Sequence, residues 1–336
     1  MDSLNHFQLL FFDQIKRKIP KQTSLVDDIS THLNISIDSA YRRLRGEKEM
    51  SFSEIINLAK TYDVSLDSIV SNYFNEVSFT YHSFSDPGYT LKKYLESILG
   101  HLEFLKTSNE RKQMIYLSKD FPIFHYFRYP KICTFKMYFW QRFILNDPNY
   151  TNTDYNFEVI PKELLHLSNK IYGLYDEIPS IEIWNRETVN STLNQIEFFH
   201  ESGLFTNHQD VILLLEELIL LLESIEKMAE RGSKKQEDDK VENDSFSNYE
   251  LHYNEVTIGD NTIFFKLGDD RKISFITANV LNILKTTNER FCADVEAMLS
   301  NLLMKSTKIS VSSQKIRTKF FKIQYDKINN LISILR

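Results

Sequence analysis

The sequence predicts a mainly α-helical chain that ends in a small α+β region with antiparallel hairpins. Only 8 Gly and 7 Pro occur in 336 residues, which favours helices with few tight turns. Apolar side chains recur at helical spacing through residues 1–76 and 88–232. In residues 249–336, short runs rich in β-branched and aromatic residues are separated by turn sequences at 259–261 and 268–270, which predict two or three antiparallel strands.

Changes in composition divide the chain into four parts. Residues 1–76 hold short helical patterns and are expected to form an N-terminal domain. Residues 88–232 form a helical region to which we assign dimerisation or sensing. Residues 233–248 are almost wholly polar, as is typical of a linker or loop. Residues 249–336 are therefore expected to form a separate α+β region.

The overall composition is that of a soluble globular protein, with 42% hydrophobic and 26% charged residues. The two cysteines, Cys133 and Cys292, lie far apart, which argues against a disulfide framework or a zinc site. The apolar run from Val211 to Leu222 is too short to span a bilayer. The N-terminus lacks the pattern of a signal peptide. We expect a cytoplasmic protein with no membrane partner.

The stretch that begins at Ser24 gives the clearest local predictions. Ser24 can cap a helix whose apolar residues Leu25, Ile29 and Leu33 lie four apart on one face. Asn34 follows, where the chain must turn tightly and a left-handed backbone conformation is needed. These residues predict a helix over 25–33 that ends in a tight turn.

A second helix is predicted from Ile37 to Arg45, after the capping residue Ser36. Ala40 is small, so two helices can cross closely there, and Gly46 is suited to end the helix. Ser51, followed three residues later by Glu54, predicts a capping box at the start of a third helix.

These features resemble the Cro/C1-type (XRE-like) helix-turn-helix family. The resemblance is carried by the Asn-Ile-Ser turn, the helix that ends in Arg-Gly and the closing sequence VSLDSI. The sequence AYRRLRGE is similar to the version found in regulators of the Bacteroidetes group. The family implies a five-helix DNA-binding domain whose third helix, here Ile37 to Arg45, enters the major groove. Two departures are Asn34, where the family usually has Gly, and Arg43, where it tends to have an apolar residue.

Carried onto this sequence, the resemblance predicts a set of DNA contacts. Ser36, Asp38, Ser39 and Arg42 are the candidates for the groove, and the guanidinium of Arg42 can pair with guanine O6 and N7. Arg43, Arg45 and Lys48 are predicted to hold phosphates. Tyr41 either donates its hydroxyl to a phosphate or packs against the protein. The predicted DNA-binding residues are therefore Ser36, Asp38, Ser39, Tyr41, Arg42, Arg43, Arg45 and Lys48.

The charge balance limits this prediction. The chain carries a formal net charge of −6, and residues 1–76 hold nine basic and eleven acidic residues. Non-specific affinity for DNA is therefore expected to be modest and strongly salt-dependent. A homodimer would double the number of contacts. The leucine-rich segment Asp210–Arg231 is a candidate subunit interface, with an internal bundle helix as the equal alternative.

Two other segments have alternative interpretations. The aromatic segment Phe121–Leu145 either lines a pocket for a small-molecule effector, with His125, Arg128 and Lys136 as polar anchors, or forms core. The basic segment Lys305–Gln324 either binds an anion or, as we prefer, docks as a helix on an acidic part of the protein.

Motifs for catalysis are missing, because the sequence contains no P-loop, G-x-G-x-x-G, H-E-x-x-H or G-x-S-x-G pattern. We therefore expect neither enzyme activity nor a cofactor or metal. The sequence predicts a sequence-specific regulator of transcription that binds double-stranded DNA and responds to an effector through its C-terminal regions. The alternative is a protein-interaction or defence-type module whose helix-turn-helix packs on a protein partner.

Overall fold

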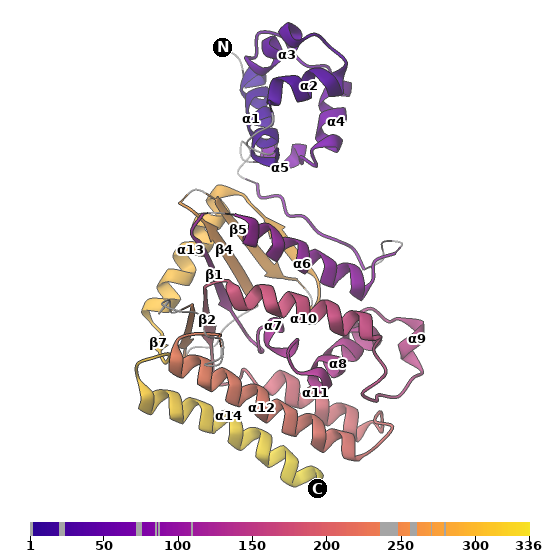
Figure 1. Cartoon of the computed structure of the whole chain (residues 1–336), viewed down its shortest axis with the longest axis vertical. Helices are drawn as coiled ribbons and strands as arrows, with labels where there is room; N and C mark the ends of the chain where they lie inside the picture. Colours follow the sequence, from indigo (N-terminus) through magenta and orange to yellow (C-terminus); the bar gives the residue numbers. More distant parts are fainter. Residues whose placement is uncertain are drawn as a thin grey trace. The chain divides into compact units, whose positions relative to one another are not determined.

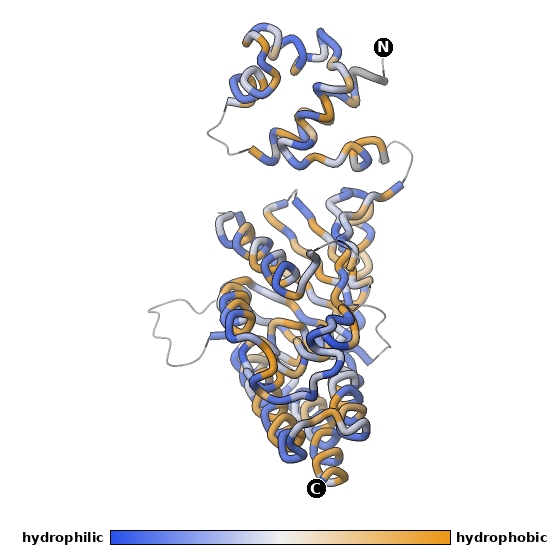
Figure 2. Tube along the Cα trace, turned by 90° about the vertical axis from the view of Figure 1, so that its right-hand side faces the viewer, coloured by the Kyte–Doolittle hydropathy of each residue, from blue (hydrophilic) through white to orange (hydrophobic). Residues whose placement is uncertain are grey.

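The computed structural model describes residues 3–19, 24–71, 76–84, 86, 88–108, 110–235, 248–255, 261–269, 271–278 and 280–336. The chain divides into two units, Met1–Phe79 and Thr80–Arg336, which are described separately. Figure 1 shows the course of the chain, and in Figure 2 hydrophilic and hydrophobic residues alternate along the helices. This alternation is expected where a helix buries one face and exposes the other.

The first unit is helical throughout its described elements. These are α1 (Ser3–Lys18), α2 (Leu25–Leu33), α3 (Ile37–Leu44), α4 (Phe52–Thr61) and α5 (Leu66–Ser71). The helices pack around buried apolar residues from α1, α2, α3, α4 and α5 and the loops between them: Phe11, Phe12, Ile15, Ile29, Ala40, Met50, Leu58, Ala59, Val64 and Ile69. The predicted helix over 25–33, the left-handed turn at Asn34 and the Ser51–Glu54 capping box are confirmed.

The second unit is built on one mixed seven-stranded sheet, whose strand order is β6-β5-β4-β1-β2-β3-β7. The central strands β1, β2 and β3 pair in parallel, and the remaining neighbours pair antiparallel. The strands are β1 (Lys112–Leu117), β2 (Ser180–Trp184), β3 (Tyr249–Tyr253), β4 (Thr262–Leu267), β5 (Arg271–Thr277), β6 (Ile283–Thr286) and β7 (Thr307–Lys308).

Helices cover both faces of this sheet (Figure 1). Along β1, Met114 and Tyr116 belong to the large core under most of the helices, whereas Ile115 and Leu117 face α13. This alternation is the period of two that a strand imposes. The helices are α6 (Leu91–Thr107), α7 (Ile123–Tyr126), α8 (Pro130–Phe139), the π-helical turn η1 (Trp140–Ile144), α9 (Pro148–Thr151), α10 (Lys162–Glu177), α11 (Asn190–Glu201), α12 (Gln209–Arg231), α13 (Glu289–Met304) and α14 (Gln314–Leu335).

The sheet corrects the predicted organisation. The fold is mixed α/β, so the mainly α prediction holds only in part, and residues 88–232 and 249–336 are not separate, because β1 and β2 lie in the same sheet as β3 to β7. Both strands are short and contain few apolar residues, and periodicity alone does not distinguish such short segments from part of a helix.

One of the two predicted hairpins is present. Strands β4 and β5 form an antiparallel pair, and Gly268, in the predicted turn between them, adopts φ 59°. The turn predicted at 259–261 lies mostly outside the described residues, and the strands on its two sides do not pair, because β3 lies between β2 and β7 in the sheet. Most of the predicted linker at 233–248 lies outside the described residues.

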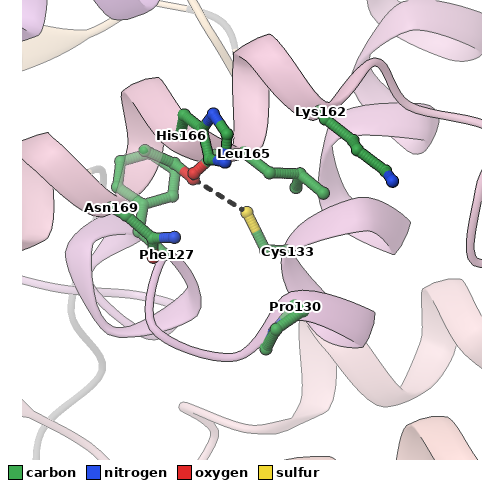
Figure 3. Close-up of a pocket in the computed structure, with 8 residues that line it drawn as sticks. Phe127, Pro130, Cys133, Lys162, Leu165, His166 and Asn169 are labelled. Carbon is green, nitrogen blue, oxygen red and sulfur yellow. Dashed lines mark hydrogen bonds between the residues drawn. The ribbon is translucent and has the colours of Figure 1, made fainter.

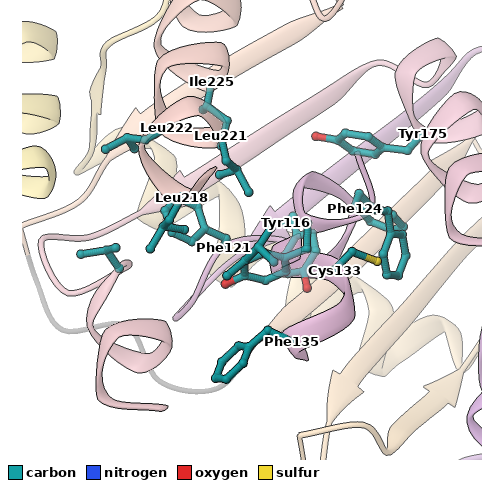
Figure 4. Packing of buried hydrophobic residues seen from close by; sticks show 14 of the residues in the cluster. Tyr116, Phe121, Phe124, Cys133, Phe135, Tyr175, Leu218, Leu221, Leu222 and Ile225 are labelled. Carbon is teal, nitrogen blue, oxygen red and sulfur yellow. The ribbon is translucent and has the colours of Figure 1, made fainter. Parts of the chain in front are cut away.

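The leucine-rich helix α12 lies inside the second unit. Its apolar face, including Leu214, Leu218 and Leu221, is buried in the large core, part of which is shown in Figure 4. Leu213 and Leu220 are exposed, at 38% and 55%. The alternative of an internal helix therefore describes the buried face of α12. No described helix is both long enough and apolar enough to cross a bilayer.

Candidate nucleic-acid interface

Hydrogen bonds at both ends fix the position of α3. The Ser36 hydroxyl accepts a hydrogen bond from the backbone N–H of Ser39 at 3.2 Å, which caps the first turn. Before it, Asn34 adopts φ 51° and the hydroxyl of Ser30 donates to the Ile35 carbonyl at 2.7 Å. After it, Gly46 adopts φ 73°, a conformation that glycine accommodates without steric cost. The helix therefore begins and ends where its sequence predicts.

The inner face of α3 packs on the rest of the first unit. Ala40 is fully buried, and Arg43, three residues later, is only 5% exposed. The Arg43 guanidinium lies 2.8 Å from the Glu54 carboxylate and also donates to the Ser39 carbonyl at 3.2 Å. Glu54 itself accepts from the backbone N–H of Ser51 at 2.8 Å in the capping box. The ion pair thus joins α3 to the first turn of α4.

A side chain of α1 holds the loop after α3. The Gln8 amide donates to the carbonyls of Arg43 and Lys48, at 2.7 and 2.9 Å, and accepts from the Met50 N–H at 3.0 Å. Gln8 therefore ties three backbone groups at the end of α3 and in the following loop to α1. Sequence reasoning missed Gln8, because no local pattern relates it to a loop some forty residues away.

The outer face of α3 carries most of the predicted DNA-binding residues. Tyr41 is 46% exposed, and the guanidinium of Arg45 lies over its ring at 5.6 Å. Arg45 also lies 3.6 Å from the Glu47 carboxylate. Asp38 and Arg42, one turn apart, have no ion pair within 4.0 Å among the described residues. The predicted residues on this face are Ser36, Asp38, Tyr41, Arg42, Arg45 and Lys48, and Ser39 is half-buried beside them.

The prediction that Arg43 holds a phosphate is wrong. Residues 40, 43 and 44 share one face of a helix, and that face is turned inward. Arg43 occupies the position at which the resembled family tends to have an apolar residue. The exposed residue that the prediction missed is Ile37, at 53% exposure on the first turn of α3.

Of the two interpretations of the aromatic segment Phe121–Leu145, core describes the positions of its three polar anchors. His125 and Lys136 are buried against Glu182 and Asp120, both at 3.0 Å, and Arg128 lies near Tyr172. None of these three anchors lines the cavity of about 200 Å³ that lies between α8 and α10. Figure 3 shows that cavity, where Cys133 faces α10. Its lining residues are Phe127, Pro130, Cys133, Lys162, Leu165, His166, Ser168 and Asn169.

A network of buried polar and charged side chains surrounds Glu182 on strand β2 of the second unit. The Glu182 carboxylate, on β2, is fully buried and accepts hydrogen bonds from His125 Nε2 at 3.0 Å, from the Tyr249 hydroxyl at 2.9 Å and from the Tyr175 hydroxyl. Burial raises the pKa of Glu182, but the charge and hydrogen bond of His125 outweigh it, so the net pKa is lowered. The group is satisfied by its neighbours and lines no described cavity, which indicates a structural role.

Lys234 completes this network. Its amine is buried and donates to the carbonyls of Tyr175 and Ile178, at 2.8 and 2.6 Å, close to the C-terminus of α10. Burial lowers the pKa of Lys234 to about 7, although Glu182 acts in the opposite direction. The amine in the unfolded chain keeps its ordinary pKa of 10.5. At pH values between about 7 and 10.5, the Lys234 amine binds a proton in the unfolded chain but largely lacks it in the folded chain.

Lys234 is therefore expected to contribute stability that rises with pH between about 7 and 10.5, and its contribution is lost as the pH falls toward 7. Replacing Lys234 by Met should flatten the slope of unfolding free energy against pH by up to about 1.4 kcal/mol per unit. Denaturant titrations at several pH values, followed by tryptophan fluorescence, measure it. The exposed neighbour Lys235, replaced by Met, is the control, and equal slopes in both variants would contradict the assignment.

Comparisons with known proteins identify no relative. No family model matches the chain, no curated protein matches it, and no solved structure resembles it significantly. Among the described residues, no group of three or more His, Cys, Asp or Glu side chains is arranged to hold a metal ion.

Proposed function

We propose that α3 binds the major groove of double-stranded DNA and that the protein is a sequence-specific regulator of transcription. The observation that carries the proposal is the different environment of two neighbouring arginines of α3. Arg43 is buried against Glu54, whereas Arg42 is exposed and has no ion pair among the described residues. An exposed, unpaired guanidinium on a helix fixed at both ends is suited to bidentate pairing with guanine.

The neighbouring side chains support the same function. Asp38 lies one turn before Arg42, and an aspartate can accept a hydrogen bond from the cytosine amine. Arg45 and Lys48 are exposed near the C-terminal end of the helix, where they can reach phosphates and set the register of the helix on the duplex. Three outward cations supply modest electrostatic affinity, which dimerisation would increase. Dimerisation itself stays a prediction.

Selection from a pool of random duplexes with the full chain tests the proposal. We expect an enriched sequence that contains a guanine, and Arg42→Ala should weaken binding to it by about 1–3 kcal/mol, a loss of roughly 5- to 150-fold. Arg336→Ala, which removes an exposed arginine of the second unit, should leave affinity unchanged. Equal affinity of wild type and Arg42→Ala for every enriched duplex contradicts the proposal.

The second candidate is a protein-interaction or defence-type module. It is favoured by three exposed apolar side chains of the first unit, Ile37, Tyr41 and Phe52, the last at 75% exposure. Co-purification with and without nuclease separates the two functions. Retention of a protein partner after nuclease treatment, together with no DNA binding at low salt, favours this second candidate.

Response to an effector also stays a prediction. The cavity between α8 and α10 has about 200 Å³, below the roughly 300–1,000 Å³ of common ligand pockets. It therefore gives this part of the prediction little support.

A further inference from the structure

The small cavity between α8 and α10 has an apolar inner part. It measures about 200 Å³ and lies in the second unit, beside the N-terminal half of α10. Phe127 and Cys133 are buried at its inner end, and Leu165 is half-buried beside them. Pro130 of α8 completes this part, and Figure 3 shows the lining residues of α8 and α10 on opposite sides of the cavity. The inner part can therefore hold an apolar group.

The outer edge of the cavity is polar, and no acidic residue is among its described lining residues. Lys162, His166 and Asn169 line it from α10, at a spacing of four and three residues on one exposed face of the helix. None of these three side chains has a hydrogen bond or an ion pair with another described residue. Lys162 carries a positive charge, and the imidazole and the amide each offer an N–H donor. The edge is therefore suited to bind a negatively charged oxygen.

The surroundings of this edge also favour a negative charge. Lys162 is the first residue of α10, and no side chain caps this end of the helix, where the helix dipole is positive. The acidic neighbour of Lys162, Glu163, forms an ion pair with Lys92 of α6, which offsets its charge. An apolar interior with a cationic edge matches a small acid that has an apolar body.

The volume of the cavity sets the size of this acid. The cavity is smaller than common ligand pockets, but a cavity of about 150 Å³ is large enough to hold benzene. We infer that the cavity binds a small carboxylic acid with an apolar body, of about the size of benzoate, whose carboxylate pairs with Lys162. The inference goes beyond the proposed function, because it concerns the second unit alone and does not depend on DNA binding.

Titrations of the full chain with benzoate and with benzyl alcohol, followed by saturation-transfer NMR, test this assignment. The two probes share an aromatic body, but only benzoate is charged. We expect a dissociation constant on the order of 1 mM for benzoate and binding of benzyl alcohol that is weaker by about three-fold. Lys162→Met should remove this difference between the probes. Lys170→Met, which replaces another exposed lysine of α10 that does not line the cavity, should retain it.

Three results would overturn the inference. The first is that benzoate does not bind in the millimolar range or binds no better than benzyl alcohol. The second is that Lys162→Met keeps the full difference between the probes, so that the carboxylate does not pair with Lys162. The third is that inorganic phosphate displaces benzoate at equal concentration, which shows an anion site that does not use the apolar interior. Both lysines are exposed, so both variants are expected to fold, and thermal unfolding checks this.

Discussion

Glu182→Gln is expected to destabilise the second unit by about 3–5 kcal/mol, the usual effect of breaking a buried charged network from one side. Three donors, from His125, Tyr175 and Tyr249, converge on the two carboxylate oxygens. The amide of Gln offers one acceptor oxygen and places its own N–H groups opposite the remaining donors. At least one buried donor then loses its partner, and Lys234 loses the nearby negative charge.

Tryptophan fluorescence during denaturant unfolding measures this effect in one unit of the full chain. Both tryptophans, Trp140 and Trp184, are buried in the second unit, and the first unit has none. The control is Glu177→Gln, because Glu177 forms an ion pair with Lys106 at 3.0 Å in which both side chains are about half exposed. Such surface pairs contribute about 0–1 kcal/mol. A Glu182→Gln variant as stable as this control contradicts the structural role of the network.

Arg43→Ala is expected to destabilise the first unit by about 2–4 kcal/mol. The guanidinium is almost fully buried and the Glu54 carboxylate is 21% exposed, so removal of Arg43 leaves a largely desolvated carboxylate without its counter-charge. Burial raises the pKa of Glu54, but the Ser51 N–H and Arg43 outweigh it, and the net pKa is lowered. The ion pair therefore stabilises the first unit fully at pH values above about 4.5, the ordinary pKa of a glutamate. This stabilisation is lost as the pH falls through the lower pKa that Glu54 has in the folded chain.

Hydrogen exchange of the segment 24–71 reports the stability of this unit in the full chain. Arg43→Met replaces the buried stem with an apolar side chain of similar length, and the double variant Arg43→Met/Glu54→Gln removes both charges together. We expect the double variant to be more stable than Arg43→Ala, because replacing both partners of a buried pair is often neutral. It should also retain DNA affinity, unlike Arg42→Ala. Loss of DNA binding in a folded double variant contradicts the inward role of Arg43.

The local structure of the first unit was predictable from the sequence because short-range chemistry determines it. Ser24, Ser36 and Ser51 each accept a hydrogen bond from a backbone N–H within three residues, and Asn34 takes the left-handed conformation expected of it. Of the residues predicted to contact DNA, Arg43 is the one that lies buried, because its ion pair with Glu54 depends on the packing of α3 against α4.

The long-range structure was not predictable in the same way. The sheet of the second unit brings β1 next to β2 and β4, which are separated from it by many helical residues, and no local pattern encodes that pairing. Likewise, Glu182 is an acidic residue in a strand whose burial depends on Tyr175, Tyr249 and His125 from three different elements. Gln8 and the loop after α3 are a further example of contacts that depend on tertiary packing.

Interference by guanine N7 methylation on the enriched duplex tests the central proposal most directly. Methylation removes the N7 acceptor to which Arg42 is proposed to donate, so wild-type binding should be blocked by methylation of a guanine in the enriched sequence. Arg42→Ala, which has no contact to lose, should bind methylated and unmethylated duplexes equally at that guanine while its remaining contacts are unchanged. Interference at the same guanines in both proteins would contradict recognition of DNA by Arg42 on α3.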